Sequence, residues 1–434
     1  MSTEIDEILA GCLGFFWPLG TASRNPQEEA QPGYIQRKAN GSLHIETLEK
    51  DLPHASPSIR PRPDAVLGKT PHGGVALLNI SGHGATFNPD RARASVSNYR
   101  GLTLITGIDA DKVRSPKAYS LSAFFPEASE WAGLTSINID PSPDGQGRST
   151  ELNIHVLSTP GGKEKFRGRL IEISTHWETS GPRNRPNIYA PLRITSSSPR
   201  ALPIVDLLKP LFRIQDLISL AYQGFVLADG GRALLQQGCE GRNPHLWNST
   251  LMHLPDHSRE IATLTENPLF WLSDLGGITG IRRWLELCHK HPRAVYPLTE
   301  YYRLGQLSPE TRLMEVAAAI EYWTGAHARS RKWPKVGNSQ AAAVARRAGQ
   351  PFSKWVGNRH AKWAKEFWEE YIAVKHFKTR TPDPYLCRLL ADSGAMLLTA
   401  VLLKSITGGS SRIVEKIFSS HRLHHLGSAI RDSI

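Results

Sequence analysis

A segment rich in positively charged and aromatic side chains carries the clearest chemical signal in this chain. Residues 325–365 contain ten lysines and arginines and no aspartate or glutamate. Three tryptophans are interleaved with these cations, namely Trp333, Trp355 and Trp363. Basic side chains neutralise phosphates, and aromatic rings offer faces on which unstacked bases can lie. The segment therefore predicts contact with single-stranded RNA. The alternative is a solvated basic connection whose tryptophans belong to the core.

The cations expected to contact RNA are spread along this segment. They are Arg329, Arg331, Lys332, Lys335, Arg346, Arg347, Lys354 and Lys362, with Trp355 as the stacking ring among them. The whole chain of 434 residues is also basic, with a formal net charge of +12. A positive balance of this size favours an acidic partner such as nucleic acid.

Two histidines next to basic residues could transfer protons. His376 follows Lys375 at the end of an aromatic and acidic helical run, and Arg359 and His360 form a second pair. Histidine has a near-neutral pKa, which suits a general acid or base. The alternative for His376 is a residue at a helix end, whose charge suits the negative end of the helix dipole.

Motifs for metals, nucleotide cofactors and membrane insertion are missing from the sequence. It contains no GxxxxGK[ST] phosphate loop, no HExxH and no zinc-deaminase signature. The cysteines stand far apart without metal-ligand spacing: Cys12, Cys239, Cys288 and Cys387. The N-terminus is acidic, unlike a secretory signal, and the apolar run 395–403 is too short to cross a bilayer. We expect no cofactor, no metal and a cytoplasmic location away from membranes.

The elements that must position these residues change in type along the chain. Between about residue 40 and residue 200, apolar and polar residues alternate with period two, and Pro, Gly, Asn and Asp clusters separate the runs. This pattern predicts an antiparallel sandwich or barrel. Later segments have helical periodicity, with Asp274, Ser308 and Asp383 as predicted N-caps and a helical stripe interrupted at Pro210.

These patterns predict an α+β protein with three parts. Residues 1–200 form a β-rich N-terminal domain, residues 201–300 a helical extension of it, and residues 301–434 an all-α bundle.

Six segments, taken in their order and spacing, resemble one family over most of the chain. They are GSLHIETLEK, VLGKTPHGGVALLNIS, YSLSAFFPEASEWAGL, RIQDLISLAYQGF, TRLMEVAAAIEYWTGAHAR and LADSGAMLLTAVLLKSITG. The chain is similar to the ApeA-type bacterial anti-phage proteins, which join a β-rich ApeA N-terminal domain to a C-terminal HEPN domain. The resemblance implies an abortive-infection defence protein with an ApeA-like residues 1–200 and a HEPN-like bundle. It also implies a homodimer through the helical domain, an RNA substrate, single-stranded or transfer RNA, and a phage-derived trigger.

The resemblance further implies a metal-independent endoribonuclease site. HEPN proteins that cut RNA carry an RNxxxH motif, in which histidine moves protons and arginine stabilises the charged phosphorus. His376 matches that histidine by position, but Tyr371 and Ile372 stand where arginine and asparagine are expected, so the segment reads YIAVKH. Lys375, or the displaced pair of Arg359 and His360, could supply the missing charge.

Two further functions compete with RNA cleavage. The first is a non-catalytic, HEPN-derived RNA-binding sensor, which needs the cations but no complete motif. The second is a carbohydrate-binding β-sandwich, whose aromatic residues Trp131, Trp177 and Tyr189 could stack on sugars.

Overall fold

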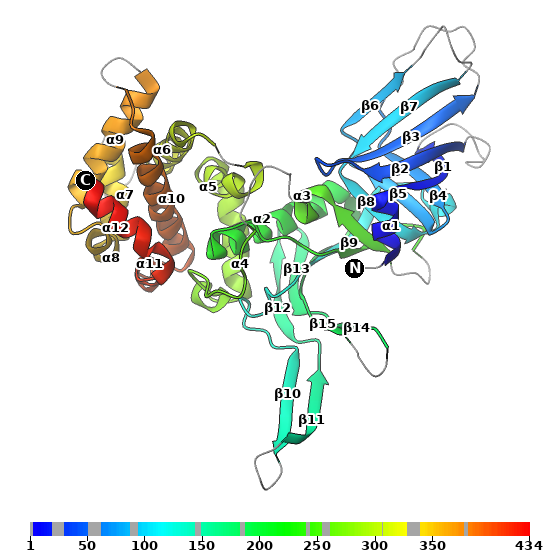
Figure 1. Ribbon diagram of the computed structural model, residues 1–434, viewed down its shortest axis with the longest axis horizontal. Helices are drawn as coiled ribbons and strands as arrows, with labels where there is room; N and C mark the ends of the chain where they lie inside the picture. The colour runs from blue at the N-terminus through cyan, green and yellow to red at the C-terminus, as the bar shows by residue number, and fades with distance from the viewer. Residues whose placement is uncertain are drawn as a thin grey trace. The chain divides into compact units, whose positions relative to one another are not determined.

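The structure is a computed structural model. It describes residues 3–19, 30–50, 62–86, 94–143, 149–182, 187–239, 244–253, 261–305, 307–327, 339–376 and 381–434. The chain forms two compact units, each with its own core. The β-rich unit comprises Met1–Glu130, Leu134–Gln215 and Leu227–Asp256, and the helical unit comprises Trp131–Gly133, Asp216–Val226 and His257–Ile434 (Figure 1). The predicted α+β class, with an antiparallel sheet followed by helices, is confirmed.

The β-rich unit is built on one antiparallel sheet, which has 14 strands within the described residues. In spatial order these are β12 (Pro160–Phe166), β13 (Arg169–Thr175), β16 (Leu192–Pro203), β9 (Lys117–Phe125), β17 (Gly231–Leu235), β18 (His245–Asn248), β8 (Thr103–Ile108), β5 (Gly73–Leu78), β4 (Ala65–Thr70), β1 (Cys12–Pro18), β2 (Gln31–Arg37), β3 (Leu43–Lys50), β7 (Ala94–Gly101) and β6 (Gly82–Thr86). The alternation seen in the sequence sets the register, because neighbouring residues of a strand point to opposite faces. On β9, for example, Leu121, Ala123 and Phe125 are all fully buried.

Glycines allow one aromatic ring to lie across the neighbouring strands β4, β1 and β2 of the sheet. Phe16 on β1 is 1% exposed. A Cβ added at Gly68 on β4 would lie 2.3 Å from Cδ1 of Phe16, and one at Gly33 on β2 would lie 3.0 Å from its Cδ2. Any larger residue at these positions would displace the ring, so local glycine content determines how tightly these strands pack.

Smaller elements complete the β-rich unit. Two hairpins form separate sheets, β10 (Ile137–Pro143) with β11 (Ser149–Val156) and β14 (Glu178–Ser180) with β15 (Asn187–Tyr189). The helical elements are α1 (Thr3–Ala10), η1 (Ala110–Lys112) and α3 (Ser249–Met252). Residues 201–300 were predicted to be helical, but they also contribute β17 and β18 to the large sheet.

The helix α2 (Ile204–Tyr222) contributes residues to both units. The sequence predicted an interruption at Pro210, whereas α2 continues through it. Pro210 removes only one backbone donor, and the stripe of buried leucines and isoleucines on either side holds the helix together. Leu207, Leu211 and Ile214 are each completely buried.

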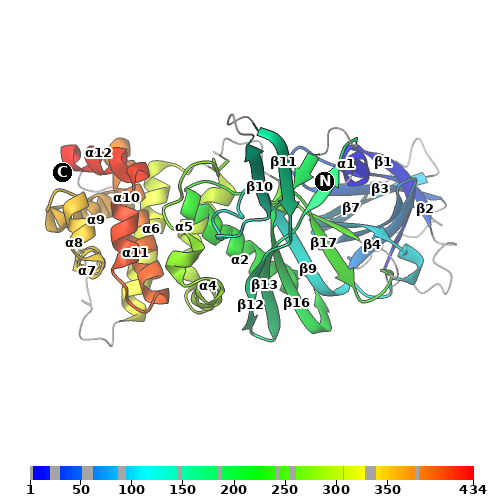
Figure 2. The same ribbon diagram turned by 90° about the horizontal axis from the view of Figure 1, so that it is seen from below.

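The helical unit is organised around one long apolar helix, α10 (Pro384–Ile406). The other elements are η2 (Leu272–Leu275), α4 (Ile278–Lys290), α5 (Pro292–Leu304), α6 (Pro309–Ala326), α7 (Ser339–Ala348), α8 (Gln350–Trp355), α9 (His360–His376), α11 (Arg412–Phe418), η3 (His421–Leu423) and α12 (His424–Ser433). Helices α4, α6, α7, α9, α11 and α12 all contact α10 (Figure 2).

By length and composition, α10 alone among the helices of the described residues could cross a membrane. The sequence had argued against a span from the shorter apolar run within it. The structure places 83% of its most apolar window inside the protein, which is typical of a core helix.

Two of the predicted N-caps are confirmed and one is wrong. The hydroxyl of Ser308 accepts a hydrogen bond from the backbone N–H of Thr311, and Asp383 accepts one from Tyr385. Asp274 does not cap α4, which begins after Gly277. Its carboxylate instead accepts a hydrogen bond of 2.7 Å from the N–H of Trp271 and belongs to η2.

Close packing between α6, α9 and α10 depends on one small residue. The indole Nε1 of Trp363 on α9 donates a hydrogen bond of 2.9 Å to the hydroxyl of Ser393 on α10. At the next position, a Cβ on Gly394 would lie 2.6 Å from Cε2 of Phe367 and 3.1 Å from Cγ1 of Val316. Gly394 therefore lets these three helices approach more closely than any larger residue would allow.

Candidate nucleic-acid interface

The four predicted catalytic residues lie in two places rather than one. Arg359 and His360 lie at the N-terminal end of α9, and Lys375 and His376 lie in its last turn. The helix has 17 residues, so its ends are about 24 Å apart at 1.5 Å per residue. The helix therefore keeps Arg359 away from His376, whereas Lys375 with His376 and Arg359 with His360 each stay together at one end.

At the N-terminal end of α9, both residues take part in local structure. Nη1 of Arg359 donates to the carbonyl oxygens of Arg431 at 3.2 Å and Ile434 at 2.8 Å. Nδ1 of His360 lies 3.0 Å from the hydroxyl of Ser353. Arg359 therefore connects the start of α9 to the end of α12.

At the C-terminal end of α9, His376 is exposed and Lys375 contacts Tyr371. The ammonium of Lys375 lies 3.3 Å from the hydroxyl of Tyr371, which occupies the expected arginine position and is 6% exposed. The buried carboxylate of Glu370 accepts a hydrogen bond of 2.8 Å from the N–H of Asp383, the cap of α10. This turn of α9 thus supports the bundle, while His376, Lys375 and Ile372, the last 42% exposed, lie open to solvent.

The tryptophans of the basic segment that the structure describes belong to the core. Trp363 is completely buried and Trp355 is 7% exposed. Trp355 packs against Phe352 and Phe418, and its Nε1 donates a hydrogen bond of 3.2 Å to the carbonyl of Leu423. The expectation that Trp355 stacks on RNA bases is therefore wrong, because its faces are covered by protein.

The described cations of the basic segment, unlike its described tryptophans, are exposed to solvent. Arg346 and Arg347 on α7, Lys354 on α8 and Lys362 on α9 are all exposed. Four other predicted RNA contacts, Arg329, Arg331, Lys332 and Lys335, lie outside the described residues.

Two further cations join this region through tertiary contacts. The ammonium of Lys404, on α10, donates a hydrogen bond of 3.0 Å to the carbonyl of Arg347. Arg431, on α12, donates one of 2.8 Å to the carbonyl of Trp355. Burial and the neighbouring charge of Arg347 lower the pKa of Lys404. A like charge nearby disfavours the protonated form of the lysine. We call the set Arg346, Arg347, Lys354, Arg359, Lys362, Lys404 and Arg431 the basic cluster.

Neither Lys404 nor Arg431 was predicted from the sequence. Lys404 lies near the end of the apolar helix α10 and Arg431 lies in α12, both far along the chain from residues 325–365. No local pattern sets them apart from other surface cations, and only the packing of α10 and α12 brings them to the cluster.

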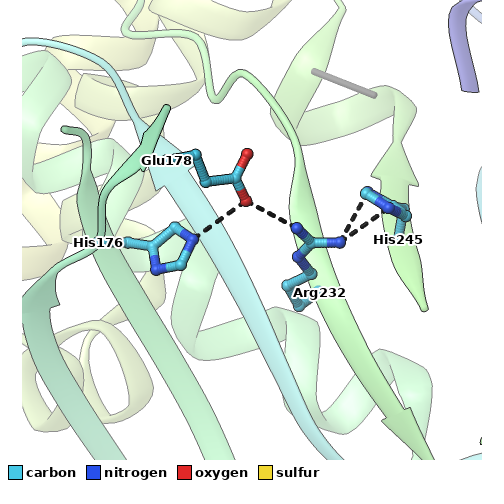
Figure 3. A network of polar contacts seen from close by, with 4 residues as sticks. All are labelled: His176, Glu178, Arg232 and His245. Carbon is cyan, nitrogen blue, oxygen red and sulfur yellow. Dashed lines mark hydrogen bonds and ion pairs between the residues drawn. The ribbon is translucent and has the colours of Figure 1, made fainter. Parts of the chain in front are cut away.

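A separate polar network lies in the β-rich unit (Figure 3). The carboxylate of Glu178 lies 3.1 Å from Nε2 of His176 and accepts a hydrogen bond of 2.7 Å from Nη2 of Arg232. The other terminal nitrogen of Arg232 lies 2.8 Å from Nε2 of His245. His176 follows β13 directly, and Glu178 begins β14. Arg232 lies on β17 and His245 on β18, far along the chain, so spacing in the sequence does not predict the network.

The charges of this network shift the pKa values of its members. Burial alone would raise the pKa of Glu178, but hydrogen bonds from His176 and Arg232 hold it below the ordinary value. Burial, followed by the charge of Arg232, lowers the pKa of His245. His245 therefore stays neutral and can accept a hydrogen bond from Arg232, which makes the network a structural connection between strands.

The residues suggested for sugar binding do not form one surface. Trp131 is completely buried, and its Nε1 donates a hydrogen bond of 3.1 Å to the carbonyl of Phe270. It belongs to the helical unit, whereas Trp177 and Tyr189 belong to the β-rich unit. Among the described residues, no group of three or more His, Cys, Asp or Glu side chains is placed to hold a metal ion.

A family model described as ApeA N-terminal domain 1 matches residues 11–284, which include every strand of the large sheet and continue into α4. Neither the curated proteins nor the solved structures contain a match to the chain.

Proposed function

The chain belongs to the ApeA family, since the matched domain covers more than half of its residues, and from this premise we propose that it is an anti-phage defence protein whose helical unit binds RNA. Membership of the family supports the defence role. The RNA-binding role is supported by the basic cluster, which is the single observation that favours it most.

The basic cluster favours contact with a phosphate backbone rather than with bases. Its members Arg346, Arg347, Lys354 and Lys362 are exposed, while the neighbouring rings of Trp355 and Trp363 are buried. Cations without accessible aromatic faces bind through charge neutralisation and counterion release, which carries little sequence preference. The ligands we propose are single-stranded RNA and transfer RNA.

Other parts of the proposal follow from the family resemblance. We propose that the protein is cytoplasmic, that it dimerises through a HEPN-like helical domain, and that a phage-derived trigger activates it. The two ends of α9 lie about 24 Å apart, which is the length of its 17 residues. In a homodimer, a cation from the N-terminal end of one protomer's α9 would lie beside His376 of the other protomer.

Metal-independent RNA cleavage is the second candidate function. It is favoured by the exposure of His376 at the end of α9, where a phosphodiester can approach the imidazole. Against it stands the buried Tyr371 at the arginine position. A purely RNA-binding sensor needs only the basic cluster.

RNA binding is tested by removing four exposed charges together. The variant replaces Arg346, Arg347, Lys354 and Lys362 by glutamine, and binding to fluorescent single-stranded RNA and transfer RNA is followed by anisotropy at several salt concentrations. Each lost phosphate contact lowers the slope of log K against log salt by about 0.7 for a single strand. We therefore expect the slope to fall by up to about 3 with all four removed.

A matched control removes the same charges from the β-rich unit. Two lysines and two arginines are exposed there and can be changed to glutamine: Lys117, Lys165, Arg167 and Arg200. RNA binding through the basic cluster predicts that this control keeps the parent's salt slope. If both variants lost RNA affinity and salt slope equally, the loss would be explained by net charge alone, and the proposed site would be refuted. In parallel, RNA cleavage in EDTA by the parent and by His376→Ala separates the nuclease from the sensor.

A further inference from the structure

A partly open cavity of about 420 Å³ within the helical unit is lined by three arginines. Its walls come from α5, α6, α10, η3 and α12. Arg312, Arg388 and Arg422 line it together with the carboxylate of Asp392, while Glu315 and Glu266, outside the lining, pair with Arg312 and Arg422. Its volume falls within the range of small-molecule sites, about 300–1,000 Å³.

Arg312 is a buried cation with an unused donor. Its side chain is 7% exposed, its Nη1 donates to the carbonyl of Pro297, and its guanidinium lies 4.2 Å from the ring centroid of Tyr301. The Nε is buried and has no hydrogen-bond partner among the described residues. The nearest carboxylate oxygen paired with it, on Glu315, is 4.0 Å away. A buried donor without an acceptor is unfavourable, so the guanidinium gains a hydrogen bond when it turns toward a ligand oxygen in the cavity that Arg312 lines.

The other two arginines differ in how firmly they are held. Arg422 donates a hydrogen bond of 2.7 Å to the carbonyl of Tyr222 and lies 3.0 Å from the carboxylate of Glu266, so its guanidinium is already positioned. Arg388 is 75% exposed, and its Nε is 3.9 Å from Asp392, beyond hydrogen-bonding distance. Arg422 is thus held in place, whereas the exposed side chain of Arg388 is free to turn toward a ligand. Guanidinium groups bind phosphates through paired hydrogen bonds.

Tyrosines and aliphatic residues form the rest of the wall. Tyr301, Tyr302 and Tyr385 line the cavity beside Leu389 and Met396, and Tyr385 is 60% exposed. Burial raises the pKa of Asp392, and the charges of Arg312 and Arg388 oppose this only in part.

We propose that this cavity binds a small organic phosphate, with the phosphate held by Arg312, Arg388 and Arg422 and a planar body lying against the tyrosine rings. This site is distinct from the basic cluster, and it does not depend on RNA binding. The bound molecule would contact α5, α6, α10 and η3 at once, so its binding would stabilise the helical unit as a whole.

The test measures binding of defined probes to the full-length protein by calorimetry and thermal unfolding. The probes are phenyl phosphate, adenosine 5′-monophosphate and inorganic phosphate. The variants are Arg388→Gln and Tyr385→Ala, whose side chains are exposed, so we expect both to keep the fold of the parent. The matched control is Arg200→Gln, an exposed arginine of the β-rich unit that belongs to neither proposed site.

We expect at least one organic phosphate to bind, Arg388→Gln to weaken its binding by roughly tenfold or more, and Arg200→Gln to leave its binding unchanged. Tyr385→Ala should weaken the organic probes and spare inorganic phosphate. The proposal is overturned if no probe binds at millimolar concentration, or if both arginine variants lose binding equally. Inorganic phosphate binding as tightly as the organic probes would refute the part played by the tyrosines. RNA binding by Arg388→Gln is expected to match the parent, which separates this site from the basic cluster.

Discussion

The substitution Gly394→Ala should destabilise the helical unit, although alanine is the better helix former. Inside a helix, replacing glycine by alanine stabilises by about 1 kcal/mol. At Gly394 the new Cβ would lie 2.6 Å from Cε2 of Phe367 and 3.1 Å from Cγ1 of Val316, both closer than ordinary contacts. Relieving such overpacking costs about 1–3 kcal/mol in a close-packed core. The two effects together predict a net loss of up to about 2 kcal/mol.

The chain offers a matched control for this prediction. Gly325 also lies in a helix, α6, but a Cβ added there meets no atom within 4 Å. The same change at Gly325 should therefore leave the protein as stable as the parent or up to about 1 kcal/mol more stable. Urea unfolding followed by tryptophan fluorescence measures the free energy of unfolding for each variant, because Trp363 is buried beside Gly394.

A second substitution shows whether the clash with Phe367 is the cause. Phe367→Leu removes ring atoms that the new methyl group would meet, so the double variant should be more stable than the sum of the single changes predicts. Residues in direct contact show coupling energies of about 0.5–3 kcal/mol. The reasoning fails if Gly394→Ala stabilises the protein as Gly325→Ala does, or if the two changes at Gly394 and Phe367 are additive.

Two other properties of the protein can be checked in solution. The pKa of His245 is below its ordinary value of 6.5 in the folded state, so the unfolded state takes up a proton first and stability falls as the pH drops below about 6.5. Glu178, whose pKa is also lowered, adds a second loss below its ordinary value of 4.5. Urea midpoints between pH 7.5 and 5.5 should fall less in His245→Gln than in the parent, and parallel profiles would argue against the network. Burial raises the pKa of Cys387 to about 12. A thiol reagent at pH 8 should therefore modify Cys387 only after the protein unfolds. Rapid labelling of Cys387 in the native protein would contradict its burial.

Because the cations are exposed and the aromatic rings are buried, we expect RNA to bind through its phosphates and not by base stacking. If Trp355 lay on the surface, single-stranded RNA could bind by stacking, with a preference for unpaired bases. Because Trp355 is held between Phe352, Phe418 and the carbonyl of Leu423, the cations alone face solvent. Binding that depends on salt and tolerates different sequences is the expected consequence.

The sequence alone determines the local features of this protein, such as helix caps and the type of each element. Ser308 and Asp383 cap α6 and α10 as expected, because a cap bonds to backbone groups only two or three residues away. The antiparallel sheet and the later helices also follow from periodicity, which each segment carries within itself. The absence of an arginine at position 371 is equally plain from the sequence, and no fold could supply one from that segment.

Everything that depends on which side chains meet across the fold was decided by tertiary structure. Trp355 and Trp363 are buried because α8 and α9 pack on α10 and α11, and nothing in their spacing separates a core ring from an exposed one. Lys404 and Arg431 join the basic cluster only through contacts with α7 and α8. The cavity takes Arg312, Arg388 and Arg422 from three distant parts of the chain. The physical reason is that burial and charge proximity depend on long-range packing, whereas caps and periodicity depend on a few neighbouring residues.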